Sequence, residues 1–222
     1  MRKLVLFALD EFKVVNTLRS KLLKGHIVLV SLAVLWVCSI AGFGYLIRYD
    51  MEEGSTGVVA AGWPSQTPLS LEGQGNTLVV FLHPQCPCSM ATVTELAKVV
   101  DHYRAPLKIY ADIANSYLDS KTKQLKCVGE SQPGATRLVK YVSEIPGVQL
   151  VSDPDSKIAT AFGAETSGYT MLYNQHGKLL FAGGITSSRG HEGDNDSADS
   201  LIAALKGESN RAASAPVFGC RL

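Results

Sequence analysis

The sequence carries almost no net charge. Its 222 residues include 21 Lys and Arg against 20 Asp and Glu, which leaves a formal charge of +1. A balance this even creates no strong electrostatic field, so it gives no indication of binding to nucleic acid. The sequence also lacks internal repeats and low-complexity tracts. Its length fits one or two ordinary domains.

One stretch lacks charged residues altogether. Between His26 and Ile47 the sequence has no Asp, Glu, Lys or Arg. A helical apolar run of about 20 residues matches the hydrocarbon thickness of a bilayer. A core helix of a soluble domain rarely stays uncharged over this length, and a signal peptide has a shorter apolar region of about 7–15 residues. We therefore predict an uncleaved transmembrane helix at residues 26–47.

The charges on either side of this run predict its orientation. Arg48 follows it and then come acidic residues at 50, 52 and 53, whereas the preceding segment contains Arg2, Lys3, Lys13, Arg19, Lys21 and Lys24. Basic segments stay cytoplasmic, so the remainder of the chain is expected to be translocated. In a bacterium this predicts a single-pass protein of the inner membrane, with a cytoplasmic N-terminus and a periplasmic domain. The arm at residues 1–25 is either an amphipathic basic helix on the inner membrane surface or a topology signal alone.

The remaining chain divides into a linker and one domain. Residues 48–75 are rich in Gly and Pro, which predicts a linker, and residues 76–222 have the size of a single domain. The apolar periodicity predicts strands at 77–83, 107–113, 148–152, 169–173 and 178–181, and helices at 89–103, 133–145, 153–162 and 197–206. The last two strands are expected to form a hairpin. This order predicts an α/β fold, a mixed sheet flanked by helices on both faces.

Two of the five cysteines form a Cys-Pro-Cys motif. Cys86, Pro87 and Cys88 lie between the first predicted strand and the first long helix of the domain. Unpaired backbone N–H groups and the positive end of a helix dipole favour a thiolate at such a position. Because the thiolate is the reactive form, Cys86 and Cys88 are the candidate catalytic residues. Cys38 lies in the predicted span and is interpreted as a small apolar residue.

The one-residue spacing leaves the role of the other cysteines open. A disulfide across so short a loop is expected to be strained, which favours the reduced form and would make the oxidised pair an oxidant or isomerase. Cys127 or Cys220 is the alternative resolving thiol, unless these two form a structural disulfide. A further alternative is a site for a soft ion, Cu(I) or Zn²⁺. Its ligands would be Cys86, Cys88 and His83, with His191 or Cys220.

Four segments of the domain resemble one family. The segments FLHPQCPCS, FGAETSGYTMLYN, FAGGITSSRGHEGDN and PVFGCRL are similar to those of membrane-anchored bacterial thioredoxin-like proteins of the RedB-like family. The similarity extends over about residues 75–222 and implies a thioredoxin-like mixed sheet, with redox cysteines at the N-terminus of the helix that follows a central strand. It implies that Cys86, the first cysteine, is the nucleophile, whereas helix-end geometry alone favours Cys88.

The sequence departs from the thioredoxin pattern in two places. Thioredoxins have Trp-Cys-Gly-Pro-Cys, whereas here Gln85 precedes Cys86 and one residue fewer separates the cysteines. Thioredoxins also have a cis-proline that faces the cysteines and pairs with the substrate peptide. No proline stands in the matching stretch, where Gly168 or Tyr169 would take its place, so substrate binding is expected to differ.

A loop rich in glycine and polar residues extends from Gly183 to Asn195. It is either a surface loop that ends in the N-cap of the last helix, or it folds over the cysteines. In the second case Arg189 would stabilise a thiolate, and His191 would shuttle protons or bind a metal. His83, beside the motif, is a similar candidate, or a structural histidine.

The sequence thus supports one leading function and two others. The first is a thiol–disulfide oxidoreductase without a cofactor, acting on protein thiols and disulfides or on a small thiol. The second is a copper-binding or metal-centre assembly factor of the same fold. The third is peroxide reduction, which the residue at 83 disfavours because peroxiredoxin relatives have a Thr three residues before their cysteine.

Overall fold

The structure is a computed structural model that describes residues 2–103, 105–122, 124–127, 133–208 and 213–222. It divides into two compact units, one that ends at Tyr49 and one that extends from Asp50 to Leu222.

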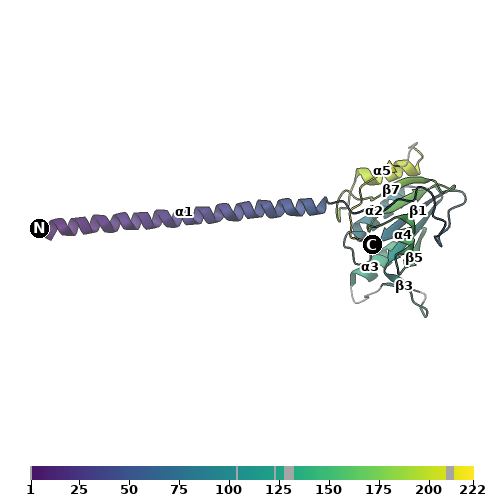
Figure 1. The fold of residues 1–222 in the computed structure, drawn as a ribbon, viewed down its shortest axis with the longest axis horizontal. Coiled ribbons are helices and arrows are strands. Elements are labelled where there is room, and N and C mark those ends of the chain that lie inside the picture. Colours follow the sequence, from purple (N-terminus) through teal and green to yellow (C-terminus); the bar gives the residue numbers. More distant parts are fainter. Residues whose placement is uncertain (1, 104, 123, 128–132, 209–212) are drawn as a thin grey trace. The chain divides into compact units, whose positions relative to one another are not determined.

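The first unit is made by a single helix, α1 (Arg2–Asp50) (Figure 1). Within it, Leu23–Asp50 is the one segment of the described chain that is long and apolar enough to cross a membrane, with a mean hydropathy of 2.4. Its large apolar side chains are exposed, and Trp36, for example, is 69% exposed. Exposed apolar surface of this extent is costly in water and favourable in hydrocarbon. The helix is therefore a candidate transmembrane span, and it contains the run predicted at residues 26–47.

The second unit is built on a six-stranded mixed sheet, in the order β5-β2-β1-β6-β7-β8. The central strand β1 runs parallel to β2 and antiparallel to β6, and β7 continues the hairpin predicted from the sequence. The strands of this sheet are β1 (Asn76–Leu82), β2 (Leu107–Ala114), β5 (Val148–Asp153), β6 (Thr170–Tyr173), β7 (Leu179–Gly183) and β8 (Ala213–Ser214). The first five confirm the predicted strands to within two residues at each end.

Three further strands have no counterpart in the sequence prediction. β3 (Ser116–Leu118) and β4 (Leu125–Cys127) pair as a separate two-stranded sheet, and β8 adds two residues at the edge of the main sheet. Two or three residues are too few to establish a period of two, so hydrophobic patterning gives no signal for them.

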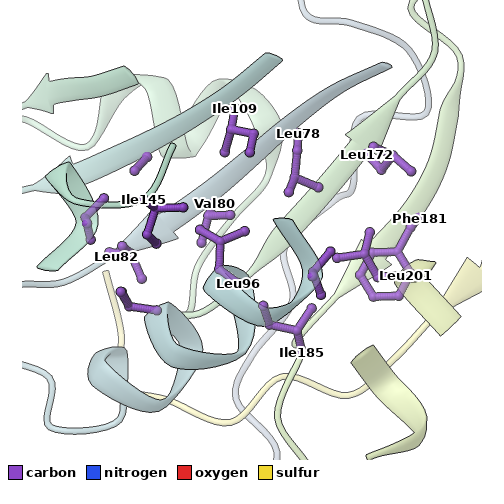
Figure 2. Close-up of a cluster of buried hydrophobic side chains, with 14 of the residues drawn as sticks. Leu78, Val80, Leu82, Leu96, Ile109, Ile145, Leu172, Phe181, Ile185 and Leu201 are labelled. Atoms are coloured by element: carbon purple, nitrogen blue, oxygen red, sulfur yellow. The ribbon is translucent and has the colours of Figure 1, made fainter. Parts of the chain in front are cut away.

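Helices cover both faces of the sheet, as predicted. The side chains of β1 alternate between two apolar clusters, one on each face of the sheet. The strand is therefore buried on both sides. Leu78, Val80 and Leu82 point to a cluster that Leu96 and Leu201 complete from the helices (Figure 2). The helices on this face are α2 (Ser89–His102), α3 (Pro133–Ser143) and α5 (Asp196–Leu205), and α4 (Lys157–Phe162) covers the other face.

α4 begins later than the predicted residue 153. The carboxylate of Asp153 accepts hydrogen bonds from the backbone N–H groups of Lys157, Ile158 and Ala159, at 2.8, 3.0 and 3.0 Å. An acidic side chain that binds the first free N–H groups ends the preceding strand and begins the helix. Asp153 is therefore the side chain that caps α4.

Residues 51–75 form no helix or strand, yet they lie against the domain. The ring of Trp63 packs edge-on against Phe162 and Tyr173, with centroids 5.1 and 5.2 Å apart. Its backbone N–H donates to the carbonyl of Gly177 at 2.9 Å, and that of Gly54 donates to Val217 at 2.7 Å. This segment completes the apolar cluster on the α4 face.

Candidate functional site

The Cys-Pro-Cys motif lies in a tight turn between β1 and α2. The N–H of Cys86 donates to the carbonyl of His83 at 3.0 Å, and the N–H of Ser89 donates to the carbonyl of Cys86 at 3.1 Å. Both cysteines are buried, with Cys86 only 3% exposed. The turn thus holds the two thiols at the carboxyl end of the central strand, as the motif predicts.

Cys86 is the thiol that the site stabilises as a thiolate. Burial alone would raise its pKa. Hydrogen bonds from the backbone N–H and thiol of Cys220, the N–H of Cys88 and the hydroxyl of Ser89 outweigh burial, so the pKa of Cys86 is lowered. The Cys220 N–H lies 3.3 Å from the Cys86 sulfur.

Cys88 has the opposite electrostatic environment, although it lies at the N-cap of α2. Burial and the negative charge of the Cys86 thiolate raise the pKa of Cys88. The guanidinium of Arg189 and the N–H of Gly190 lower it in part. The helix end therefore favours Cys86 rather than Cys88, because the Cys88 N–H is one of the groups that donate to the Cys86 sulfur.

Cys220 is the third thiol of the site. Its burial and its hydrogen bond to Cys86 raise the pKa of Cys220 to about 11. In the cluster of Cys86, Cys88 and Cys220, named here the thiol cluster, Cys86 is therefore the thiol that loses its proton first. The sequence predicts Cys220 only as one of several possible partners.

The segment that faces the motif contains the predicted Gly168 and Tyr169, but these two residues bind β1. The N–H of Gly168 donates to the carbonyl of Phe81 at 2.7 Å, and the N–H of Phe81 donates to the carbonyl of Tyr169 at 2.9 Å. Tyr169 is buried in the cluster on the α4 face, and burial raises its pKa.

Ser167 is the residue of this segment that contacts the site, and sequence reasoning missed it. Its hydroxyl lies 2.8 Å from that of Ser89 and accepts from the N–H of His83 at 2.9 Å. Its own N–H donates to the carbonyl of Cys220 at 2.8 Å. Ser167 therefore links the motif to the C-terminal segment. The signal that the sequence offered for Ser167 was the Thr-Ser pair before the hairpin. Such pairs are too common to indicate a site residue.

The contacts of His83 are those expected of a structural histidine. Its Nδ1 accepts from the N–H of Gln85 at 3.2 Å, and its Nε2 lies 3.1 Å from the side-chain amide of Asn115. Burial lowers the pKa of His83, so the neutral ring is favoured. These contacts hold the turn rather than point the ring at a sulfur.

The loop at residues 183–195 reaches the thiol cluster. Glu95 of α2 is buried and accepts from the N–H of Gly193 at 2.8 Å, and the Asn195 amide donates to the carbonyls of Ile185 and Gly193. These bonds hold the loop beside α2. Its Arg189 donates through Nη1 to the carbonyl of Gly219 at 2.6 Å, next to Cys220.

Both expectations for this loop describe part of it. The charge of Arg189 offsets part of the rise in the pKa of Cys88 and of Cys220. Asn195 is the N-cap of α5, where its side chain accepts from the N–H of Ala198 at 2.9 Å. His191 is exposed, and its Nε2 lies near Gly193.

Comparison with solved structures identifies the fold. A hypothetical protein from Sinorhizobium meliloti has a TM-score of 0.54 at 19% identity, covering 75% of this chain and 97% of its own. An uncharacterised conserved protein from Geobacillus kaustophilus has a TM-score of 0.50 at 16% identity, covering 77% and 91%. A thioredoxin-like protein from Aeropyrum pernix has a TM-score of 0.41 at 15% identity, covering 78% and 99%. The globular unit is a mixed α/β sheet flanked by helices, the architecture that the resemblance stated from the sequence implies. No family model matches the sequence, and no curated protein matches it.

The structure also bears on two alternatives from the sequence, a structural disulfide between Cys127 and Cys220 and a metal site. Cys127 ends β4 and is buried in the apolar cluster under α3, whereas Cys220 belongs to the thiol cluster. Among the residues that the structure describes, no three His, Cys, Asp or Glu side chains are grouped so that they could hold a metal ion.

Proposed function

We propose that this chain is a membrane-anchored thiol–disulfide oxidoreductase of the RedB-like family, with the Cys86-Pro87-Cys88 motif as its redox centre. The observation that supports this most is the placement of two buried thiols in the turn between β1 and α2, with the N–H of Cys220 3.3 Å from the Cys86 sulfur. Donors from three residues surround the Cys86 sulfur and lower its pKa, while the pKa of Cys88 is raised. A stabilised thiolate beside a second thiol is the arrangement that thiol–disulfide exchange requires.

The proposed exchange has two steps. The Cys86 thiolate attacks one sulfur of a substrate disulfide, forms a mixed disulfide, and releases the other sulfur as a thiolate that takes up a proton. Cys88 then loses its proton and attacks the Cys86 sulfur, which forms the Cys86–Cys88 disulfide and releases the second substrate thiolate. Two electrons pass from the motif to the substrate, and the reverse sequence oxidises a substrate dithiol. The exchange uses sulfur chemistry alone, without a cofactor.

The proposed location is the bacterial inner membrane, with the domain in the periplasm. The candidate span in α1 and the basic residues before it support this orientation. The periplasm is an oxidising compartment in which disulfides form and persist. The partners would be protein thiols and disulfides or a small thiol, and the lipid bilayer would hold the anchor.

Trapping of a mixed disulfide tests the nucleophile. The full-length chain in detergent micelles would carry Cys220→Ser, because Cys220 lies beside Cys86 and could resolve the intermediate. With a disulfide-bonded probe peptide, Cys88→Ser should accumulate a covalent adduct on a non-reducing gel, and Cys86→Ser should form none. Cys127→Ser is the matched control and should match its parent.

Two outcomes would contradict the proposal. Adducts with Cys86→Ser and none with Cys88→Ser would assign the nucleophile to Cys88. No adduct with either variant, together with stoichiometric Cu(I) in the purified chain that is lost on Cys86→Ser, would replace exchange by metal binding.

A further inference from the structure

The C-terminal segment at residues 217–222 lies along the candidate site and is held there by backbone hydrogen bonds and one isolated bridge. The N–H of Ser167 donates to the carbonyl of Cys220 at 2.8 Å, and the N–H of Leu222 donates to the carbonyl of Glu165 at 2.9 Å. Thr166 and Arg221 form an antiparallel bridge between these bonds. The segment thus pairs with the backbone edge beside the motif as an added strand would.

Side-chain packing fixes the segment in this register. Val217 and Phe218 are buried, and the carbonyl of Gly219 accepts the bond from Arg189. A Cβ on Gly219 would overlap the carbonyl oxygen of Ser167, so the close approach requires glycine. The result is that the next residue, Cys220, is held with its N–H 3.3 Å from the Cys86 sulfur.

We propose that Cys220 is a third redox thiol, the intramolecular exchange partner of Cys86. This inference rests on the proposed function. Once the motif is oxidised, Cys220 loses its proton and attacks the Cys86 sulfur of the Cys86–Cys88 disulfide. A Cys86–Cys220 disulfide forms, the Cys86–Cys88 bond breaks, and Cys88 leaves as a thiolate that takes up a proton. No electrons enter or leave in this step, so it needs no further oxidant.

The electrostatics of the cluster favour this order of events. Apart from burial, the pKa of Cys220 is raised by the hydrogen bond to Cys86 and by the charges of Cys86 and Cys88. A disulfide between Cys86 and Cys88 carries no charge, so these contributions vanish on oxidation while the lowering effect of Arg189 stays. Cys220 therefore becomes easier to deprotonate once its target disulfide exists.

Peptide mapping tests the inference on the full-length chain in detergent micelles. The chain is oxidised in a glutathione buffer, remaining thiols are blocked with N-ethylmaleimide, and tryptic peptides are analysed by mass spectrometry. Cleavage after Arg48, Lys98, Arg211 and Arg221 places both motif cysteines in one peptide and Cys220 in another. We expect a disulfide that links the two peptides, retained in Cys88→Ser and lost in Cys86→Ser. Cys127→Ser is the control and should leave the linkage unchanged.

The outcomes separate this inference from the proposed function. If the motif peptide loses two hydrogens while Cys220 stays fully alkylated, exchange at the motif stands and the role of Cys220 is wrong. If all three cysteines stay alkylated across the buffer range, both fail. In Cys220→Ser, the oxidised population should shift to the Cys86–Cys88 disulfide. Thermal unfolding of the reduced variant should match that of the reduced parent, since the docked backbone is unchanged.

Discussion

Asp112 is the residue whose environment is least expected from the sequence. It is fully buried in β2, and neither carboxyl oxygen has a hydrogen-bond partner among the described residues. Burial, and then the negative charge of Asp153, raise the pKa of Asp112 well above 3.8. Asp112 is therefore protonated in the folded state over a wide range of pH.

This predicts a loss of stability with rising pH. The unfolded chain loses the Asp112 proton above about pH 4, while the folded chain keeps it up to its raised pKa. Between these values the unfolded state binds fewer protons, so the free energy of unfolding falls as pH rises, by up to about 1.4 kcal/mol per pH unit. Asp112→Asn should remove this slope above pH 5. Urea unfolding followed by Trp63 fluorescence, in a Trp36→Phe background, measures it.

Asp119→Asn is the control for this experiment. Asp119 is partly buried, and backbone N–H groups of Thr122 and Lys121 lower its pKa to about 2. Its titration lies below the measured range, so the substitution should leave the slope above pH 5 unchanged. A slope that persists in Asp112→Asn would assign the pH dependence to another group.

The site shows which residue-level features a sequence can predict. The motif and its position follow from residues 83–89 alone, because strand, turn and helix start are local. The order of the pKa values of the three thiols does not follow from those residues, because it depends on contacts between residues that are distant in the sequence. The bond between Cys86 and Cys220 joins residues 134 positions apart, and that between His83 and Ser167 spans 84 positions. Spacing and propensity carry no information on such pairs.

Among the elements, long periodic segments are predictable and short ones are not. β1 and α2 have seven and fourteen residues with a clear apolar pattern. The three strands that prediction missed have two or three residues. The segment at 51–75 has the composition of a linker, yet Trp63 holds it on the domain through aromatic contacts that the Gly and Pro content conceals.

Gly168 offers a test of how the turn before β6 is held. Its φ is +93°, and a Cβ would lie 2.8 Å from Oγ1 of Thr92. Gly168→Ala should therefore cost about 1–2 kcal/mol for the left-handed backbone, with a further cost for the contact. Gly147→Ala, with φ of +79° and open space around it, should show the backbone cost alone. When Thr92→Ala is also present, the loss of stability caused by Gly168→Ala in urea unfolding should fall close to that caused by Gly147→Ala. If this loss does not become smaller, the contact with Thr92 costs nothing.

The two units of the chain require different surroundings. The sheet unit buries its large apolar side chains in two clusters, whereas Leu35 and Trp36 of α1 are 64% and 69% exposed. A helix satisfies its backbone hydrogen bonds internally and can therefore carry such side chains into hydrocarbon. With α1 as the candidate span, the flanking charges predict that the thiol cluster lies on the side of the membrane opposite the basic arm.

Labelling in bacterial spheroplasts tests this orientation. In a background with all five cysteines replaced by Ser, Lys121→Cys should react with a membrane-impermeant maleimide in intact spheroplasts. Ser20→Cys should react only after permeabilisation, because the basic arm is expected to stay in the cytoplasm. Changing the basic residues at 19, 21 and 24 to Gln and the acidic residues at 52 and 53 to Lys should increase labelling at position 20 in intact spheroplasts. The reverse pattern in the parent would place the thiol cluster in the cytoplasm, where thiols are kept reduced. The proposed exchange would then act as a reductase, and a Cys86–Cys220 disulfide would form only transiently.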